Sequence, residues 1–501
     1  MTAMRETDRP TLARDAAHQT TPYLDALRAY AANEPARLNV PGHKAGSGAD
    51  RRIVRALGPA AFELDVPPLL WGVDRGPSPT PLEQALELAA DAWGARRTWF
   101  LTNGASQGNQ ATCLALRALG STVVVQRSVH SSVIDGLVLS GLVPRFVAPT
   151  VDAELGVAHG VTPAAVAAAL AAAGDDVAAA YVVTPSYFGA VADVAGCAAA
   201  AHAAGVPLIV DEAWGAHFGF HPALPHNALR QGADVVISST HKLAGSLTQS
   251  AMLHIGAGPF ADVLEAQLER AHRALESTSA SSLLYASLDA ARHNLAVDGE
   301  RLFGEALEAA GELRRAVREE VGLPVADAAF LRYDDVVAFD PLRVVIDTRA
   351  TGLDGLQVGA RLRALAGVDV EVLSRAAIVA VIGPGEQREG GRALVRGLAA
   401  LPVAERPLPN WTAGATAVGT PAMSPREAFL APTEVVPAAH AVGRISADSL
   451  ATYPPGIPNV LPGEQVTADV IAALQRCVEQ GGWVRGAPTG AVTHLRVVRA
   501  D

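Results

Sequence analysis

The chain has few cysteines and no long apolar run. Three cysteines, Cys113, Cys197 and Cys477, lie far apart in 501 residues, which excludes a disulfide framework and a zinc site built on cysteine. The first 20 residues lack the apolar core of a signal peptide, and no stretch is apolar enough for long enough to cross a membrane. We therefore expect a cytoplasmic protein without a metal site and without a membrane partner.

The chain also lacks a positive net charge. Its formal net charge is −11, which argues against a nucleic-acid backbone as a partner. Half of the residues are hydrophobic and 18% are charged, so a large core can form and extensive disorder is not expected. The length corresponds to about three domains at roughly 150 residues each.

Short β-rich runs alternate with helical patterns through the first half of the chain. Continuous apolar strands separated by helices, such as the pattern at 193–205, are typical of a mainly parallel sheet with helices on both faces. A long helical stretch at 285–321 precedes a second set of strands, and proline and glycine become frequent beyond about residue 400. The predicted strands are 121–128, 177–187, 206–214 and 233–240, followed by 343–348, 368–373 and 376–383.

Polar side chains follow three of the predicted strands, at the point where each strand ends. Asp211 follows one apolar run, and His130 follows another. Ser239, His241 and Lys242 follow a third. Ligands of open α/β sheets bind at the carboxyl ends of the strands. About one β–helix–β unit separates Asp211 from Lys242, so we expect both in a single site.

A glycine-containing turn begins an amphipathic helix in the segment 100–120. The segment reads FLTNGASQGNQATCLALRALG. Free backbone N–H groups and the helix dipole converge on residues 104–108. Such a turn is an anion cradle, most often for phosphate.

A phosphate cradle, an aspartate and a desolvated lysine together suit pyridoxal 5′-phosphate (PLP). Burial lowers the pKa of a lysine and frees its amine to form a Schiff base with the aldehyde. The aspartate would keep the ring nitrogen protonated, because such a pair at about 4 Å is worth roughly 4 kcal/mol at an effective dielectric near 20. His130 would stack on the ring, and Ser239 and His241 would reach the phosphate.

Each of these features also has a purely structural explanation. A strand-end aspartate is more often a helix cap, and a lone lysine more often lays its stem along apolar surface. Turns rich in glycine and serine begin many helices without binding a ligand, and a lone histidine is more often a satisfied polar group. The order and spacing of all four features favour the cofactor site.

Motifs along nearly the whole chain resemble those of the Orn/Lys/Arg decarboxylases, which are fold-type I PLP enzymes. The motifs are TPYLDALRAY, LNVPGHKAGSG, FLTNGASQGNQA, DEAWGAHFGFHPALP, STHKLAGSLTQSAMLH and YPPGIPNVLPGE. The resemblance implies an α/β fold of the aspartate aminotransferase type. It also implies a flexible arm at 1–20, a large PLP-binding domain at 21–300, a smaller α/β domain at 301–395 and a C-terminal α+β domain at 396–501.

The resemblance also implies the role of each site residue. Lys242 matches the Schiff-base lysine, Asp211 the partner of the ring nitrogen, and His130 the stacking histidine; Lys242 or His241 would donate a proton during catalysis. Ala213 matches the small residue against the other ring face. The phosphate and ring neighbourhood matches Ala105, Ser106, Gln107, Ser239 and His241, and Thr278 and Ser279 match contacts to the site of a second subunit.

The activity that the resemblance implies is decarboxylation of arginine, lysine or ornithine, a small basic amino acid, to an amine that feeds polyamine or diamine synthesis. A homodimer or higher oligomer is expected. Trp214 stands where many short-form members have histidine, and we expect it and Glu464, in a Pro/Gly-rich loop, to contact substrate. The alternatives are another fold-type I reaction, such as that of an aminotransferase or lyase, and a non-catalytic PLP-binding homologue.

Overall fold

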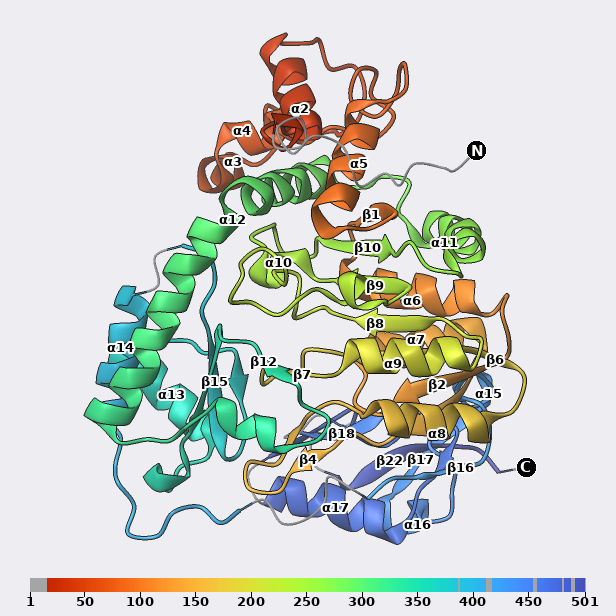
Figure 1. The fold of residues 1–501 in the computed structure, drawn as a ribbon, viewed down its shortest axis with the longest axis vertical. Helices are drawn as coiled ribbons and strands as arrows, with labels where there is room; N and C mark the ends of the chain where they lie inside the picture. Colours follow the sequence, from red (N-terminus) through yellow and green to blue (C-terminus); the bar gives the residue numbers. More distant parts are fainter. Residues whose placement is uncertain are drawn as a thin grey trace.

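A central seven-stranded sheet organises the molecule (Figure 1). The computed structural model describes residues 16–385, 388–410, 417–453, 457–479, 482–487 and 492–500. The strands are β1 (Arg97–Leu101), β2 (Thr122–Gln126), β3 (Val143–Val147), β6 (Val177–Val183), β8 (Leu208–Asp211), β9 (Val235–Ser238) and β10 (Ala251–Ile255). Their order is β1-β10-β9-β8-β6-β2-β3, and the five strands from β9 to β3 run parallel. The predicted mainly parallel sheet is confirmed; β10 pairs antiparallel with β9 and with the edge strand β1, so β10 runs opposite to the other six strands of this sheet.

Helices cover both faces of this sheet because its strands are apolar on both sides. One face packs against α6 (Gly104–Leu116), α7 (Ser131–Ser140) and α11 (Ala261–Leu275), and the other against α8 (Pro163–Ala173) and α9 (Val194–Ala203). Along β9, Val235 and Ile237 face the first layer and Val236 faces the second. Gly108 lets α6 approach β9 closely, since a Cβ there would lie 2.8 Å from Ile237 Cγ2. This contact brings the N-terminus of α6 to the carboxyl end of β9.

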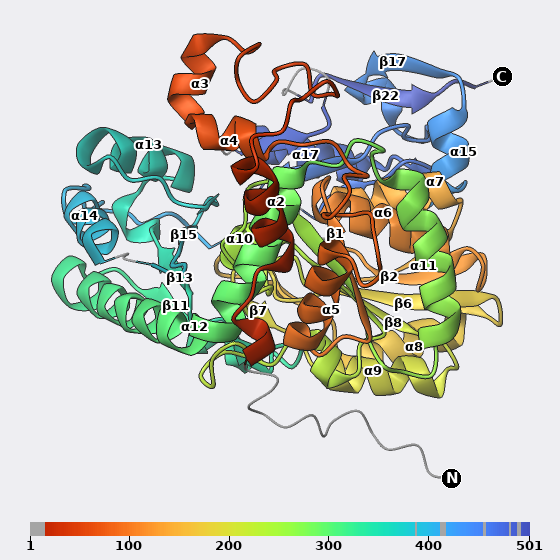
Figure 2. The ribbon, with the colours of Figure 1, turned by 90° about the horizontal axis from the view of Figure 1, so that it is seen from above.

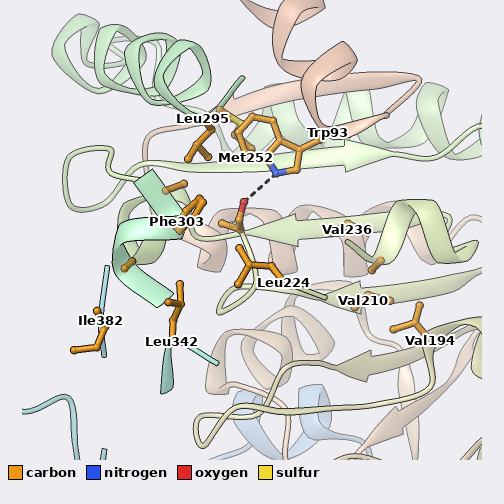
Figure 3. Close-up of a cluster of buried hydrophobic side chains, with 14 of the residues drawn as sticks. Trp93, Val194, Val210, Leu224, Val236, Met252, Leu295, Phe303, Leu342 and Ile382 are labelled. Carbon is orange, nitrogen blue, oxygen red and sulfur yellow. Dashed lines mark hydrogen bonds between the residues drawn. The ribbon is translucent and has the colours of Figure 1, made fainter. Parts of the chain in front are cut away.

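A 35-residue helix, α12 (Ser282–Ala316), joins the large sheet to a smaller antiparallel one. Phe303 of α12 lies in one apolar cluster with Leu342 and Ile382 of the smaller unit and with Met252 of β10 (Figure 3). The predicted boundary at residue 300 falls inside this helix, and the division into domains stays a prediction. The smaller unit contains β11 (Val325–Ala326), β13 (Arg343–Asp347), β14 (Val372–Leu373), β15 (Ala377–Val381), α13 (Gly355–Ala366) and α14 (Arg388–Ala399).

The N-terminal segment crosses one end of α12 (Figure 2). It contains α2 (Pro22–Ala32), α3 (Arg51–Leu57), α4 (Pro59–Leu64) and α5 (Pro81–Trp93). A flexible arm was predicted for residues 1–20, of which 1–15 lie outside the described residues. His18 is 7% exposed and hydrogen-bonded to Asp91, and Arg292 donates hydrogen bonds to the carbonyls of His18 and Thr20. The chain is therefore held in place before residue 20, because α12 supplies donors for its backbone.

The C-terminal unit packs beneath α7 and β2 and mixes short antiparallel strands with helices (Figure 1). This arrangement confirms the expected α+β class. Its elements are β16 (Thr420–Pro421), β17 (Thr433–Pro437), β18 (Leu450–Tyr453), β19 (Pro458–Val460), β20 (Glu464–Gln465), β21 (Trp483–Arg485), β22 (His494–Val498), α15 (Pro425–Leu430), α16 (Ala438–Ala441) and α17 (Ala468–Glu479). Across the described ranges, no helix combines the length and the apolarity that a membrane span requires.

Candidate active site

A cavity of about 210 Å³ lies at the carboxyl ends of β2, β6, β8 and β9. Most of the predicted site residues line it, and they come from distant parts of the chain. Of the larger cavities, two of about 470 and 510 Å³ lie along α14 and contain none of the predicted residues. Another, of about 330 Å³, is lined by Arg127 and Glu464. The lining residues are Gly104, Ala105, Ser106, Asn109, Ser128, His130, Val183, Pro185, Tyr187, Asp211, Ala213, Trp214, Ser239, His241 and Lys242.

Lys242 lies in α10 (Thr240–Leu243), a single helical turn that directly follows β9. Its Nζ atom is 3.9 Å from the centroid of the Trp214 ring. The pKa of Lys242 is lowered from 10.5 to about 8, with burial as the largest cause; the charge of Asp211 opposes the shift, that of Arg343 adds to it, and that of Glu371 opposes it. The amine is therefore much more easily freed of its proton than that of a surface lysine.

Trp214 is held in place from behind by Arg343 of β13. The guanidinium carbon of Arg343 lies 4.2 Å from the Trp214 ring centroid, and its Nη2 donates to the Trp214 carbonyl at 3.0 Å. Asp340 accepts from Arg343 Nε at 3.2 Å, so the guanidinium is charge-paired although it is fully buried. One indole thus lies between the cavity lysine and a buried arginine of the smaller unit.

Asp211 is the last residue of β8 and is 2% exposed. Its Oδ1 accepts from the backbone N–H of Ala213 at 3.0 Å, and its Oδ2 accepts from Asn109 Nδ2 at 3.0 Å. Both oxygens therefore have a fixed donor while the side chain lines the cavity. Glu212 points to the other side of the sheet, where Ala228 donates to it, as expected for the next residue of a strand.

The surroundings of both cavity histidines lower their pKa values, with desolvation as the largest cause for each. His241 Nδ1 lies 2.7 Å from the carbonyl of Ser250. Because a carbonyl only accepts, Nδ1 carries the proton of neutral His241 and Nε2 carries none. His130 is the N-cap of α7 and accepts at Nδ1 from the backbone N–H of Ser132.

The N-terminus of α6 lacks a side-chain cap, since Asn103 makes no capping hydrogen bond. Gly104 has φ +68° and donates its N–H to the Gln249 carbonyl at 2.7 Å. Ala105 and Ser106 follow in the first turn, where N–H groups have no acceptor within the helix. These N–H groups, at the positive end of the helix dipole, suit a phosphate.

Four predicted site residues lie outside this cavity. Gln107 turns its side chain away, donating to Glu276 and accepting from the Asn103 N–H at 3.1 Å, so only its backbone belongs to the turn. Thr278 and Ser279 are exposed on the loop before α12. Glu464 is the fourth.

The surroundings of Glu464 argue against the expected substrate contact, which stays a prediction. The carboxylate is 4% exposed and forms a two-pronged ion pair with Arg127, with Nη2 donating to Oε2 at 2.8 Å. Leu461 N–H also donates to Oε2 at 2.9 Å. Glu464 is thus paired with Arg127 between the C-terminal unit and the residue after β2, and it lines a separate cavity of about 330 Å³, not the one that contains Lys242.

Sequence reasoning missed several residues that shape the cavity or its walls, and three of them bear on its chemistry. Asn109 and Tyr187 line it, and Arg343 supports Trp214. Asn109 stands in the phosphate-turn motif and Tyr187 is the last residue of the predicted strand 177–187, so position gave a signal for both. Arg343 begins a predicted strand of the smaller unit, and nothing local connects it with Trp214.

Comparison with known proteins gives this arrangement a context. The family "Orn/Lys/Arg decarboxylase, major domain" matches residues 21–333, and the C-terminal domain of the same family matches 410–480. The chain is 34% identical over 483 residues to the arginine decarboxylase of Bacillus subtilis and 34% over 498 to that of Halalkalibacterium halodurans, covering 96% of this chain and 98% of each relative. The lysine decarboxylase LdcF of Francisella novicida has the same fold, with a TM-score of 0.80 at 20% identity, covering 96% of this chain and 82% of that one.

Proposed function

This chain belongs to the Orn/Lys/Arg decarboxylase family and is a PLP-dependent decarboxylase of basic amino acids, and we propose that its substrate is arginine. One observation supports the site assignment above all: the desolvated amine of Lys242 lies in the same cavity as Asp211 and the N-terminus of α6, which has no side-chain cap. Arginine is supported by the names of the relatives that are 34% identical over nearly the full length. The lysine decarboxylase structure shares only the fold at 20% identity.

The residues of the cavity suit PLP on three independent grounds. The first turn of α6 offers N–H groups without helical acceptors for the phosphate. Asp211 offers a carboxylate that two fixed donors orient. Lys242 offers an amine whose pKa is about 8. His130 and Ala213 would lie against the two ring faces, and Ser239 and His241 beside the phosphate and ring.

When bound, PLP supplies an electron sink for the electron pair left when carbon dioxide departs. The cavity wall formed by Pro185, Tyr187 and Trp214 would exclude water from the substrate α-carboxylate. Asp211 would hold the ring nitrogen protonated. The chain therefore contributes orientation and charge placement, not a reactive group beyond Lys242.

Lys242 is the better candidate for returning the proton to the substrate α-carbon. Burial keeps His241 neutral, and its proton lies on Nδ1 against the Ser250 carbonyl. Its Nε2 therefore has a lone pair and no proton to give. Lys242 lies in the same cavity and carries a transferable proton at neutral pH, since its pKa is about 8.

Glu371 replaces Glu464 as the candidate acceptor for the distal guanidinium. It is exposed on the loop before β14, and its charge raises the pKa of both Lys242 and Arg343. Glu371 lines the cavity of about 510 Å³ along α14, and it lies near enough for its charge to act on both Lys242 and Arg343. A guanidinium taken from water needs such an opposing charge.

We also propose that two copies share their sites. Thr278 and Ser279 would reach the phosphate of the partner subunit, since they are exposed and lie outside the cavity of their own chain. Large apolar side chains on the N-terminal segment support an interface there. Their exposed fractions are 97% for Leu38, 68% for Val40, 67% for Leu69 and 76% for Trp71.

A panel assay tests the substrate. Carbon dioxide and amine release are measured with L-arginine, L-lysine and L-ornithine, and keto-acid release is measured in parallel. We expect kcat/KM to be at least about tenfold higher for arginine, the difference that roughly 1.4 kcal/mol of selective recognition produces. Preferred turnover of lysine or ornithine would refute the arginine assignment, and keto-acid release would refute decarboxylation as the main reaction.

A complementation assay tests the shared site. Lys242→Ala and Thr278→Glu should each be inactive, and unfolding and refolding them together should restore part of the activity, because one site of the mixed dimer would receive both native residues. Absence of recovery in a mixture that forms dimers would contradict the shared site.

A further inference from the structure

A buried chain of hydrogen bonds connects the aspartate and the histidine of the cavity through Asn109. Asn109 lies on α6 and is 1% exposed. Its Nδ2 donates to Asp211 Oδ2 at 3.0 Å and to Ser132 Oγ at 2.9 Å. Ser132 Oγ in turn lies 2.8 Å from His130 Nδ1. One amide is therefore linked to both groups that would hold the cofactor ring, directly to Asp211 and through Ser132 to His130.

Tyr181 determines which way the Asn109 amide points. Its hydroxyl, on β6, lies 2.8 Å from Asn109 Oδ1 and can only donate there. Tyr181 is 1% exposed, and burial raises its pKa well above the ordinary value, so the hydroxyl keeps its proton. With the amide oxygen facing Tyr181, the two amide hydrogens have to go to Asp211 and Ser132.

The same reasoning fixes the proton of His130. Ser132 Oγ already accepts from Asn109, so its single hydrogen is free to be donated to His130 Nδ1. The Ser132 backbone N–H also donates to Nδ1, at 3.2 Å. An imidazole nitrogen that accepts carries no proton, so neutral His130 carries its proton on Nε2. Among the described residues, none accepts a hydrogen bond from this N–H.

We propose that Asn109 is a positioning residue that sets two properties of the site at once: the orientation of the Asp211 carboxylate and the Nε2–H tautomer of His130. This inference rests on the proposed roles of Asp211 and His130 for its catalytic meaning. The hydrogen-bond directions themselves do not depend on those roles, because protein atoms alone determine them.

The tautomer is measured directly by 15N NMR on histidine-labelled apoprotein, with His130→Gln assigning the His130 signals. We expect wild-type His130 to show an unprotonated Nδ1 and a protonated Nε2. Asn109→Ala and Ser132→Ala should give a mixture of tautomers, and Tyr181→Phe, which keeps the fold and the ring, should do so more weakly. A protonated Nδ1 in the wild-type apoprotein would overturn the proposal.

A matched control separates positioning from packing. Thr112 lies one turn further on α6, is 0% exposed and bonds only to the Gly108 carbonyl, so Thr112→Val removes a buried hydroxyl outside the chain of hydrogen bonds. It should leave the His130 tautomer unchanged. If it alters the tautomer as much as Asn109→Ala does, the effect is one of packing and the proposal is wrong.

The PLP-loaded protein gives a second readout. Asn109→Ala should lower kcat at least about tenfold with little change in KM, the effect of removing one hydrogen bond to a charged group. It should also shift the pH at which the bound cofactor changes colour. An unchanged colour profile and kcat would refute the link to Asp211. Failure to decarboxylate any basic amino acid would count against the proposed function and leave the tautomer result intact.

Discussion

Replacing Glu464 by glutamine should loosen the C-terminal unit and leave the cavity intact. Glu464 and Arg127 are 4% and 7% exposed at their side chains and bind each other through two hydrogen bonds. Arg127 Nε also donates to the Pro458 carbonyl at 3.2 Å, so the pair fastens β19 to the residue after β2. Glutamine keeps the shape and removes the charge, which leaves a buried guanidinium without its counter-ion.

The size of this effect follows from the burial of the pair. Removing one partner of a buried ion pair costs about 3 to 5 kcal/mol, which is about a hundredfold to several thousandfold in an opening equilibrium. Hydrogen exchange is the appropriate assay, because a protein of several units has no single free energy of unfolding. We expect peptides covering 457–465 to exchange faster by that factor in Glu464→Gln, with kcat and KM for arginine within about twofold of the wild type.

Glu434 provides the control within the same unit. It pairs with Arg444, but the two side chains are 39% and 27% exposed, so the pair is worth at most about 1 kcal/mol. Glu434→Gln should change exchange by no more than about fivefold. If Glu464→Gln exchanges like this control while its KM for arginine rises, Glu464 binds substrate and the reasoning from burial is wrong.

Three further changes address the cavity. The chain contains two lysines, Lys44 and Lys242, so borohydride treatment of the Lys44→Arg variant should link PLP to Lys242 alone. The rate of covalent PLP uptake should rise up to about pH 8 and then level off, because the amine is free above its pKa. A label on another residue, or acceleration that continues to pH 10, would contradict this. Asp211→Asn should keep PLP bound and slow turnover about a thousandfold, since roughly 4 kcal/mol of charge stabilisation is lost; more than a tenth of the wild-type rate would exclude the role. Glu371→Gln should raise KM for arginine about tenfold or more with kcat nearly unchanged, and an unchanged KM would remove Glu371 from the site.

The grouping of polar residues at the ends of several strands could be predicted, because parallel strands bring their carboxyl ends to one edge of the sheet. Asp211, His130 and Lys242 each follow an apolar run, and the structure places all three at one cavity. The turn at the start of α6 was predictable for a similar reason, since small residues before an amphipathic helix leave its N–H groups free. Both inferences use local sequence and a rule about the sheet.

The remaining features depend on contacts between residues that are far apart in the sequence. Glu464 stands in a Pro/Gly-rich loop. This composition is equally compatible with a loop that closes over a site and with a loop that connects two structural units. Its partner Arg127 lies 337 positions away, and no local signal connects them. Asn109 was visible within the phosphate-turn motif, but its position between Tyr181, Ser132 and Asp211 arises only when β6, α7 and β8 are assembled.

The charges around Lys242 suit the two roles that we propose for it, nucleophile and proton carrier. Burial and Arg343 favour the free amine, whereas Asp211 and Glu371 favour the ammonium, and the resulting pKa is about 8. Freeing the amine at pH 7 then costs about 1 kcal/mol, compared with about 5 kcal/mol for a lysine at its ordinary pKa of 10.5. Neither protonation state of Lys242 costs much free energy at neutral pH, which is what the proposed roles of nucleophile and proton donor within one cycle would require. The Trp214 ring between Lys242 and Arg343 suits this balance, because its face attracts the cation without binding it as a carboxylate would.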